Sequence, residues 1–402
     1  MMTDASQPTR ALAELAVRLG ANLQPGQILS LSCEPGKEQL ARAIAEVAYA
    51  DGAKFVDLEV FDYHLKRARI LNADPETLDY VPPWYGERVL ALGDHRCATV
   101  SLSGPTSPHV MEGVSPELLG RDMLPHVKES SQVVNDRTIN WTVVPCPTAD
   151  WGQLVYPELD PDAALAKLWD EVGYVCRLDA DDPVAAWTAR LNTLEAIADR
   201  LTGLSLDALR FEGPGTDLTV GLFQSSRWKC ARLSTIDGII HAPNLPTEEV
   251  FTTPDPARVD GVVTSTKPLF VSGTCVTGLR VRFEGGRAVE IDADEQAPVL
   301  RSLTEHDDGA VRLGEVALVD RESRIGQLGT VFFDTLLDEN AASHIALGHG
   351  LDFAIDDERD RERVNVSDLH IDFMIGSDDV SVTGIGRDGG ELPLLVRGAW
   401  QI

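Results

Sequence analysis

The sequence predicts two domains: an α/β N-terminal domain with a mostly parallel sheet, followed by an α+β, β-rich domain. Three observations support this prediction. Residues 1–182 alternate between helix-like and strand-like segments, which is typical of βαβ units. A break at Asp181, Asp182 and Pro183 then precedes a long amphipathic stretch. Over 204–402 the chain is rich in short β runs separated by Gly and Pro turns.

The spacing of apolar residues defines the expected elements of the N-terminal domain. Apolar residues at helical spacing indicate helices, whereas alternation or short β-branched runs indicate strands. On this basis we expect helices at 11–19 and 39–49, and strands at 27–32, 54–60, 97–102 and 141–144. Strands separated by helices predict a parallel sheet with helices on its faces.

The stretch AAWTARLNTLEAIADRL has the pattern of one long amphipathic helix. We therefore expect a connecting helix over 183–203, between an N-terminal domain at 1–182 and a second domain at 204–402. Within the second domain, Gly285-Gly286 separates two alternating runs and indicates a β-hairpin.

The composition excludes several classes of function. The chain has 402 residues, 43% hydrophobic and 25% charged, which is ordinary for a globular protein. Its net charge of −29 repels nucleic-acid phosphates and anionic lipids, so we expect neither nucleic acid nor a membrane as a partner. We expect no signal peptide and no membrane span, because the required apolar runs are missing. The six cysteines are scattered without a CxxC pair, which favours free thiols and a cytoplasmic location.

The segment DLHIDFMIG, near the C-terminus, has the pattern of a strand with two chemically active side chains on one face. Successive strand residues point to opposite faces, so Ile371 and Phe373 share one face. His370 and Asp372 share the other face and look into the same space. Taken alone, this pair fits either a solvated strand face or half of a metal site.

Carboxylates in apolar or small-residue surroundings support the metal hypothesis. Glu248 and Glu249 lie in NLPTEEVFTTP, Glu315 lies in RLGEVALV, and Glu339 and His344 lie in FFDTLLDENAASHIALG. A charge in such a setting is unfavourable unless it is paired or binds a metal. Carboxylates and imidazoles without a thiol are ligands of hard or borderline metals. A set of five or six suits two metals about 3.5–4 Å apart, bridged by a carboxylate and a water.

Several motifs occur in a characteristic order along the second domain. They are GPGTDLTVGL, NLPTEEVFTTP, GEVALV, DENAASHIALG and HIDFMIGS, all between residues 205 and 377. In this order and spacing they resemble the thermophilic metallo-aminopeptidases of the aminopeptidase T and aminopeptidase S type. The resemblance implies an enzyme that removes single amino acids from the free N-terminus of peptides. It also implies a cytosolic homodimer with two metal ions in each subunit.

By motif position, the same resemblance implies the metal ligands. It assigns this role to Glu249, Glu315, Glu339, His344, His370 and Asp372, with Glu315 as a bridging or shared carboxylate. The implied cofactors are two divalent metal ions, and zinc, cobalt, manganese and magnesium all accept such ligands.

Peptide hydrolysis at neutral pH requires a nucleophile and a proton acceptor. A water that bridges two divalent cations has its pKa lowered towards about 7, and the same cations polarise the scissile carbonyl. A nearby carboxylate would accept the proton of this water and pass it to the leaving amine. Glu249, or its neighbour Glu248, is the candidate for this base.

One position departs from the family pattern. Seven residues after His344, the family carries a tyrosine thought to hydrogen-bond near the reacting carbonyl, whereas this chain has Leu351. Leucine cannot donate that bond, and losing one such donor can lower a rate by orders of magnitude. His349, two residues away, could replace the donor or could lie at the surface.

Two alternatives to the aminopeptidase stay open. His344, His370 and Asp372 match the two-histidine, one-carboxylate triad of a mononuclear non-haem iron oxygenase, or of another metal-dependent enzyme on the same scaffold. Such a site gives no role to the three candidate glutamates. The chain could also be a weakly active or non-catalytic member, because the expected tyrosine is Leu351.

Overall fold

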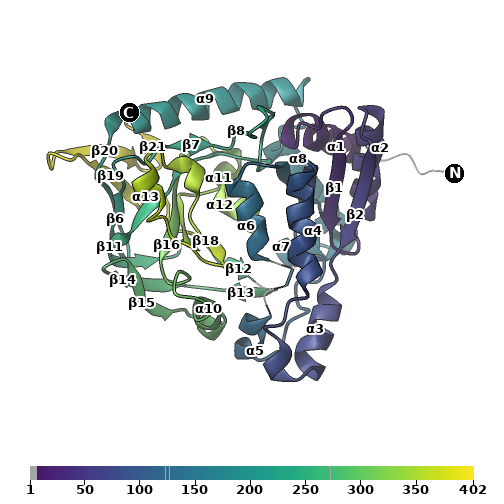
Figure 1. Ribbon diagram of the computed structural model, residues 1–402, viewed down its shortest axis with the longest axis horizontal. Coiled ribbons are helices and arrows are strands. Elements are labelled where there is room, and N and C mark those ends of the chain that lie inside the picture. The colour runs from purple at the N-terminus through teal and green to yellow at the C-terminus, as the bar shows by residue number, and fades with distance from the viewer. Residues whose placement is uncertain (1–6, 123, 126, 272) are drawn as a thin grey trace.

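The computed structural model describes residues 7–122, 124–125, 127–271 and 273–402. Two parts lie side by side: an N-terminal α/β part in purple and blue, and a β-rich C-terminal part in green and yellow (Figure 1). This arrangement confirms the predicted fold class. In the described ranges, no helix is long and apolar enough to cross a membrane.

A parallel sheet forms the centre of the N-terminal part, with the strand order β2-β1-β3-β4. Each predicted strand is found to within one residue at either end, because each is a short apolar or alternating run bounded by turn residues. The strands are β1 (Ile28–Cys33), β2 (Phe55–Val60), β3 (Ala98–Ser103) and β4 (Asn140–Pro145).

The two faces of this sheet differ in character. Leu29, Leu31 and Val100 point into a buried apolar core that α1 (Gln7–Leu15), α2 (Glu38–Ala50) and α8 (Pro161–Val175) cover. Ser30 and Ser101, next to these residues in sequence, point to the opposite face. The other helical segments of this part are η1 (Ala16–Gly20), α3 (Tyr63–Asn72), η2 (Pro75–Thr77), α4 (Pro83–Asp94), α5 (Pro116–Arg121), α6 (Lys128–Asn135) and α7 (Ala149–Val155).

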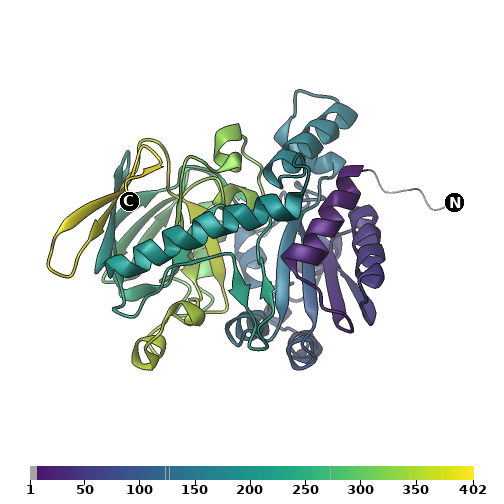
Figure 2. The same cartoon turned by 90° about the horizontal axis from the view of Figure 1, so that it is seen from above.

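A long helix joins the two parts. Helix α9 (Pro183–Leu204) closely matches the predicted connecting helix at 183–203, and the side chain of Asp182 caps its first turn by accepting from Ala185 N–H. Its buried residues Trp187 and Leu191 belong to the N-terminal core, whereas Leu194 and those after it belong to the C-terminal core. Figure 2 shows the helix lying across both parts of the molecule. The helix therefore anchors each part to the other.

Two antiparallel sheets form most of the C-terminal part and enclose its apolar core. The larger has the order β15-β14-β11-β6-β5-β19-β20-β21, and the smaller has the order β18-β17-β16-β10-β7. The predicted hairpin is present between β14 and β15, with Gly285 and Gly286 at φ values of 54° and 82°.

The elements of the C-terminal part follow the short β runs of its sequence. Its strands are β5 (Ala208–Gly213), β6 (Thr216–Leu222), β7 (Lys229–Cys230), β8 (Leu233–Ser234), β9 (Ile240–His241), β10 (Glu249–Thr252), β11 (Pro254–Thr264), β12 (Leu269–Val271), β13 (Thr274–Val276), β14 (Arg280–Glu284), β15 (Arg287–Asp292), β16 (Leu313–Val319), β17 (His344–Gly348), β18 (His370–Met374), β19 (Ser381–Ile385), β20 (Glu391–Val396) and β21 (Ala399–Trp400). Its helical segments are α10 (Ala297–Thr304), α11 (Arg324–Leu328), α12 (Thr335–Glu339), η3 (Asp352–Ala354) and α13 (Glu358–Arg361).

Helix α12 is docked onto the N-terminal part by buried polar contacts. Asp334 caps this helix and accepts a hydrogen bond from Gly104 N–H at 2.8 Å, across the junction between the parts. The Trp151 indole donates to Phe332 O at 2.6 Å, just before the helix. Phe332 and Leu337 thereby complete the N-terminal core. The predicted domain limits stay a prediction, since side chains from both sides of residue 204 share this core.

We predict that Asp334→Ala lowers the free energy of unfolding by about 3 kcal/mol. The substitution removes a helix cap and leaves the buried N–H of Gly104 without its acceptor. Urea denaturation followed by tryptophan fluorescence measures the change. The control is Asp357→Ala, which removes the cap of α13, a helix with no buried residues, and should lose about 1 kcal/mol or less. Equal losses in the two variants would contradict the docking role.

Candidate metal centre

The smaller sheet of the C-terminal part brings the predicted ligands onto neighbouring strands. Glu249 begins β10, Glu315 lies on β16, His344 begins β17, and His370 and Asp372 lie on β18. These strands are adjacent in the order β18-β17-β16-β10. Residues separated by up to about 120 positions in the chain are therefore fixed on one rigid surface.

Strand register places a small residue between two of the carboxylates. Ala346 on β17 pairs with Glu315 on one side and with Asp372 on the other. Directly paired residues point to the same face of a sheet. The methyl group of Ala346 therefore leaves open space between the two carboxylates, which a larger side chain would fill.

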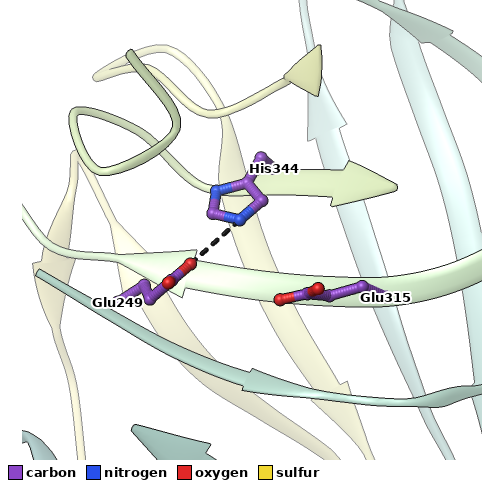
Figure 3. Close-up of side chains that lie close together, drawn as sticks. All are labelled: Glu249, Glu315 and His344. Carbon is purple, nitrogen blue, oxygen red and sulfur yellow. Dashed lines mark ion pairs between the residues drawn. The ribbon is translucent and has the colours of Figure 1, made fainter. Parts of the chain in front are cut away.

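The potential ligand atoms gather into two overlapping groups. Glu249, Glu315 and His344 form the first triad, whose ligand atoms all lie within 4.8 Å of one another. Figure 3 shows the carboxylates of Glu249 and Glu315 close together and the imidazole of His344 above them. Glu315, His370 and Asp372 form the second triad, again within 4.8 Å. Glu315 belongs to both.

Backbone carbonyls fix the orientation of both imidazoles. His344 Nδ1 lies 2.9 Å from Glu339 O, and His370 Nδ1 lies 2.8 Å from His349 O. A carbonyl oxygen can only accept a hydrogen bond, so Nδ1 carries the proton in each ring. Each Nε2 then faces the carboxylates and is the nitrogen left to bind a metal, which is the arrangement of most histidine ligands of metals.

The contacts inside the first triad fit a bound cation. Glu249 Oε2 is buried and has no hydrogen-bond partner among the described residues, although His344 Nε2 lies 3.0 Å from it. Two unprotonated ligand atoms pointing at one space repel each other unless a cation or a proton lies between them. The donors of both triads are nitrogen and carboxylate oxygen, which suits a divalent metal of hard or borderline character.

The pKa shifts of the site residues have the same cause, which is the close spacing of several carboxylates. Burial opposes the charged form of His344 and of His370, yet the surrounding carboxylates outweigh burial and raise the pKa of both rings well above the ordinary value. Burial, reinforced by Asp372 and Glu249, raises the pKa of Glu339 well above its ordinary value. A cation in this cluster would relieve the repulsion that causes these shifts.

Glu339 lies at the edge of the cluster, at the end of α12. Its Oε1 accepts hydrogen bonds from Asn244 Nδ2 at 3.1 Å and from Asn340 Nδ2 at 3.4 Å. Its pKa is influenced by all the neighbouring acidic ligand candidates, which places it within their electrostatic reach. Glu339 is thus near both triads while belonging to neither.

The structure does not bring Glu248 together with the other candidates. Its side chain is fully buried and bound by two arginines: Arg177 Nη2 lies 2.8 Å from Oε1, and Arg190 Nε lies 2.6 Å from Oε2. Its backbone N–H donates to Asn340 Oδ1 at 2.7 Å. Because neighbouring strand residues point to opposite faces, Glu248 holds β10 from behind while Glu249 faces the cluster.

A cavity of about 330 Å³ opens over the two triads, and we call it the site cavity. Apart from the ligand candidates, its lining is uncharged and includes the large apolar side chains of Trp141, Phe251, Leu351 and Phe353. Leu351 therefore lies in the cavity, at the position where the sequence analysis expected a tyrosine.

His349 lies in the site cavity with both ring nitrogens engaged. Its Nδ1 lies 3.0 Å from Ser367 O, and its Nε2 lies 3.0 Å from Asn135 Nδ2. The Ser367 N–H also lies 3.3 Å from Nδ1, so both ring nitrogens contact protein groups and neither is free to donate to a substrate carbonyl. Its backbone carbonyl orients His370, a role that no sequence pattern indicated. Sequence analysis also missed Trp141 and Asn135, which reach the cavity from the N-terminal part.

A further group of possible ligands lies outside this centre, at His306, Asp307 and Asp368. Both carboxylate oxygens of Asp307 already accept hydrogen bonds from neighbouring backbone and hydroxyl donors. These hydrogen bonds stabilise a turn, and this structural role accounts for the position of the three side chains.

The chain resembles known proteins over nearly its whole length. A family profile described as thermophilic metalloprotease (M29) matches residues 6–400. Aminopeptidase T of Thermus thermophilus is 40% identical over 399 residues, covering 97% of this chain and 98% of the relative. Aminopeptidase PepS of Streptococcus thermophilus is 34% identical over 401 residues, covering 97% of each.

A solved structure extends this likeness to three dimensions. Wild-type AmpT from Thermus thermophilus matches with a TM-score of 0.87 and 39% sequence identity, covering 98% of this chain and 99% of that one. The chain therefore belongs to the thermophilic metalloprotease family M29 and is a metallo-aminopeptidase of that family.

Proposed function

We propose that this metallo-aminopeptidase uses two divalent metal ions that share Glu315. The observation that carries this proposal is the overlap of two ligand triads at that one carboxylate. Glu249 and His344 would complete the first metal position, and His370 and Asp372 the second. Glu339 lies close enough to serve as a further ligand of the pair.

Charge balance supports two ions in preference to one. Glu249, Glu315, Glu339 and Asp372 are buried or half-buried carboxylates, and the two histidines are neutral ligands when Nε2 binds a metal. Four negative charges are neutralised by two divalent cations, whereas a single ion leaves the buried cluster negative. Zinc, cobalt, manganese and magnesium all accept these ligands.

Two ions bound here would lower the pKa of a bridging water and polarise the scissile carbonyl. Glu249, whose buried Oε2 faces the cluster without a hydrogen-bond partner among the described residues, would accept the proton of that water and pass it to the leaving amine. Glu248 acts through β10 as a positioning residue, because its own carboxylate is held by Arg177 and Arg190. The free α-amine of the peptide would bind to one of the two ions, which favours cleavage at a free N-terminus.

The site cavity favours an apolar N-terminal residue in the substrate. Phe251 and Phe353 stack edge to face with ring centroids 6.4 Å apart, and Leu351 lies with them in the lining. No charged side chain other than the ligand candidates lines this cavity among the described residues. A large apolar side chain gains free energy by leaving water there, whereas an arginine would lose hydration without a new partner.

The alternatives are less well supported. A mononuclear iron oxygenase is not favoured, because Glu249 and Glu315 belong to the ligand triads, Glu339 lines the same cavity, and the family match is to metalloproteases. We include cytoplasmic location and a homodimer in the proposal, on the strength of the family resemblance. All six cysteines are free thiols in this structure, which is compatible with a reducing compartment.

We predict two metal ions per chain and loss of Leu-p-nitroanilide cleavage after chelation. Because Glu315 is shared, Glu315→Gln should lose most of both ions, whereas Asp372→Asn should keep close to one. Elemental analysis of chelator-free protein gives the stoichiometry. A single ion in the wild type, or equal losses in the two variants, would contradict a shared carboxylate. Turnover by the wild type would show that Leu351 is compatible with catalysis.

Substitution of Glu248 should lower the stability of the protein, whereas substitution of Glu249 should lower its rate of catalysis. Glu249→Gln should fold normally and lower kcat by about 100-fold or more, since it removes the proton acceptor and one ligand of the first metal position. Glu248→Gln should lower the free energy of unfolding by about 3 kcal/mol, because it leaves two largely buried arginines without their partner. Denaturation curves and kcat of the folded fraction measure both. The reverse pattern, with kcat lost in Glu248→Gln at unchanged stability, would move the base to Glu248.

The apolar lining of the site cavity should make the enzyme prefer substrates with an apolar N-terminal residue. We expect kcat/KM for Leu-p-nitroanilide to exceed that for Arg-p-nitroanilide by about tenfold or more. Phe353→Ala should lower kcat/KM for the leucine substrate by about tenfold, because less apolar surface is buried. Phe55→Ala, at an exposed phenylalanine on β2, serves as the control and should change neither substrate. Equal kcat/KM for the arginine and leucine substrates would refute the proposal that this cavity binds an apolar N-terminal side chain.

A further inference from the structure

The second face of the N-terminal sheet is unusually polar. Parallel sheets are normally covered on both faces, so their strands read as continuous apolar runs. Here Ser30 and Ser32 on β1, and Thr99 and Ser101 on β3, line an open space in place of a packed core. The hydroxyls of Ser32 and Ser101 lie 2.8 Å apart across the strands. These groups offer donors and acceptors along one side of this space.

This polar face lines a cavity of about 600 Å³, which we call the sheet cavity. On its other side lie Leu369, His370 and Ile371 of the C-terminal part. The sheet cavity and the site cavity share Ser130, Trp141 and His370 in their linings. The polar face is therefore adjacent to the metal centre, and the space beside it is large enough for several peptide units.

Two cations in the sheet cavity differ in how they are neutralised. Arg88 is saturated: Nη1 lies 2.7 Å from an oxygen of Asp57, and Nε lies 3.1 Å from an oxygen of Glu59. Lys66, on α3, is only 6% exposed and donates to Leu124 O at 2.8 Å. No carboxylate of the described residues lies within ion-pair distance of its ammonium group. Burial lowers the pKa of Lys66 to about 8, and the charge of Asp122 offsets this shift only in part.

A buried ammonium with one carbonyl partner retains unused capacity to bind an anion. An ammonium group has three donors, and burial strengthens any charged hydrogen bond that it makes. A short peptide has an ammonium at one end and a carboxylate at the other. The metal centre of the proposed function would hold the amine end, and the carboxylate end needs a cation across the adjoining space.

We propose that Lys66 binds the C-terminal carboxylate of short peptide substrates, with the polar face of the sheet beside the peptide units between the two ends. This inference rests on the proposed aminopeptidase function and adds a second recognition point to it. It assigns the preferred substrate class as free oligopeptides in place of the N-termini of intact proteins.

The test compares peptides that differ only at the C-terminus. We expect kcat/KM for peptides of the Leu-Gly to Leu-Gly-Gly-Gly-Gly series to be about tenfold or more higher for the free acid than for the amide, at the length that reaches Lys66. Lys66→Met should bring this ratio close to one. It should leave Leu-p-nitroanilide cleavage unchanged, because that substrate has no carboxylate. Methionine matches lysine in volume and removes a buried charge, so we expect the variant to fold.

Lys54→Met removes an exposed lysine and controls for the change in net charge, so it should keep the wild-type ratio. Equal rates for acid and amide at every length, or a ratio retained in Lys66→Met, would overturn the carboxylate subsite. Failure to cleave any of these substrates would instead count against the proposed aminopeptidase function. In that case calorimetric binding of the same acid and amide decides the subsite, with loss of preference in Lys66→Met as the supporting result.

Discussion

Repulsion among closely placed carboxylates is the constraint on which the rest of the structure depends. Glu249, Glu315, Glu339 and Asp372 share one largely buried site, and such groups separate or take up protons unless they are held. A β-sheet suits this purpose because its backbone hydrogen bonds fix strand positions independently of the side chains. The strands that carry the ligands are correspondingly apolar on either side of them, and every residue of β16 and β17 is buried.

The groups behind the site restrain its charged face. Arg177 and Arg190 reach from the segment before α9 and from α9 itself to Glu248, so the connecting helix braces the strand on which Glu249 lies. The Asn340 side chain accepts from Glu248 N–H and donates to Leu336 O, which ties β10 to α12. Contacts that look purely structural therefore set the distances between ligand atoms, which decide whether a metal binds.

Local sequence patterns predicted the secondary structure well, but they could not predict contacts between residues that lie far apart in the chain. Alternation placed His370 and Asp372 on one face of a strand, and turn residues bounded the four parallel strands to within one position. No local pattern shows that Ala346 separates two carboxylates, because that depends on the register of three strands. Nor can periodicity show that Glu248 faces Arg177 and Arg190, which lie far from it in the chain. The two adjacent glutamates could therefore be assigned different roles only once the structure showed which face of the strand each occupies.

The two parts of the molecule divide the recognition of a peptide between them. The C-terminal sheet supplies the acidic cluster, whereas Trp141 and Asn135 from the N-terminal part close the site cavity above it. The contact of Asp334 with Gly104 fixes the spacing between these surfaces, because it ties the segment that carries Glu339 to the end of β3. A substrate bound between surfaces of fixed spacing is selected by its length as well as by its first side chain. The polar face of the N-terminal sheet lines the sheet cavity, which adjoins the metal centre, while the opposite face packs into the apolar core.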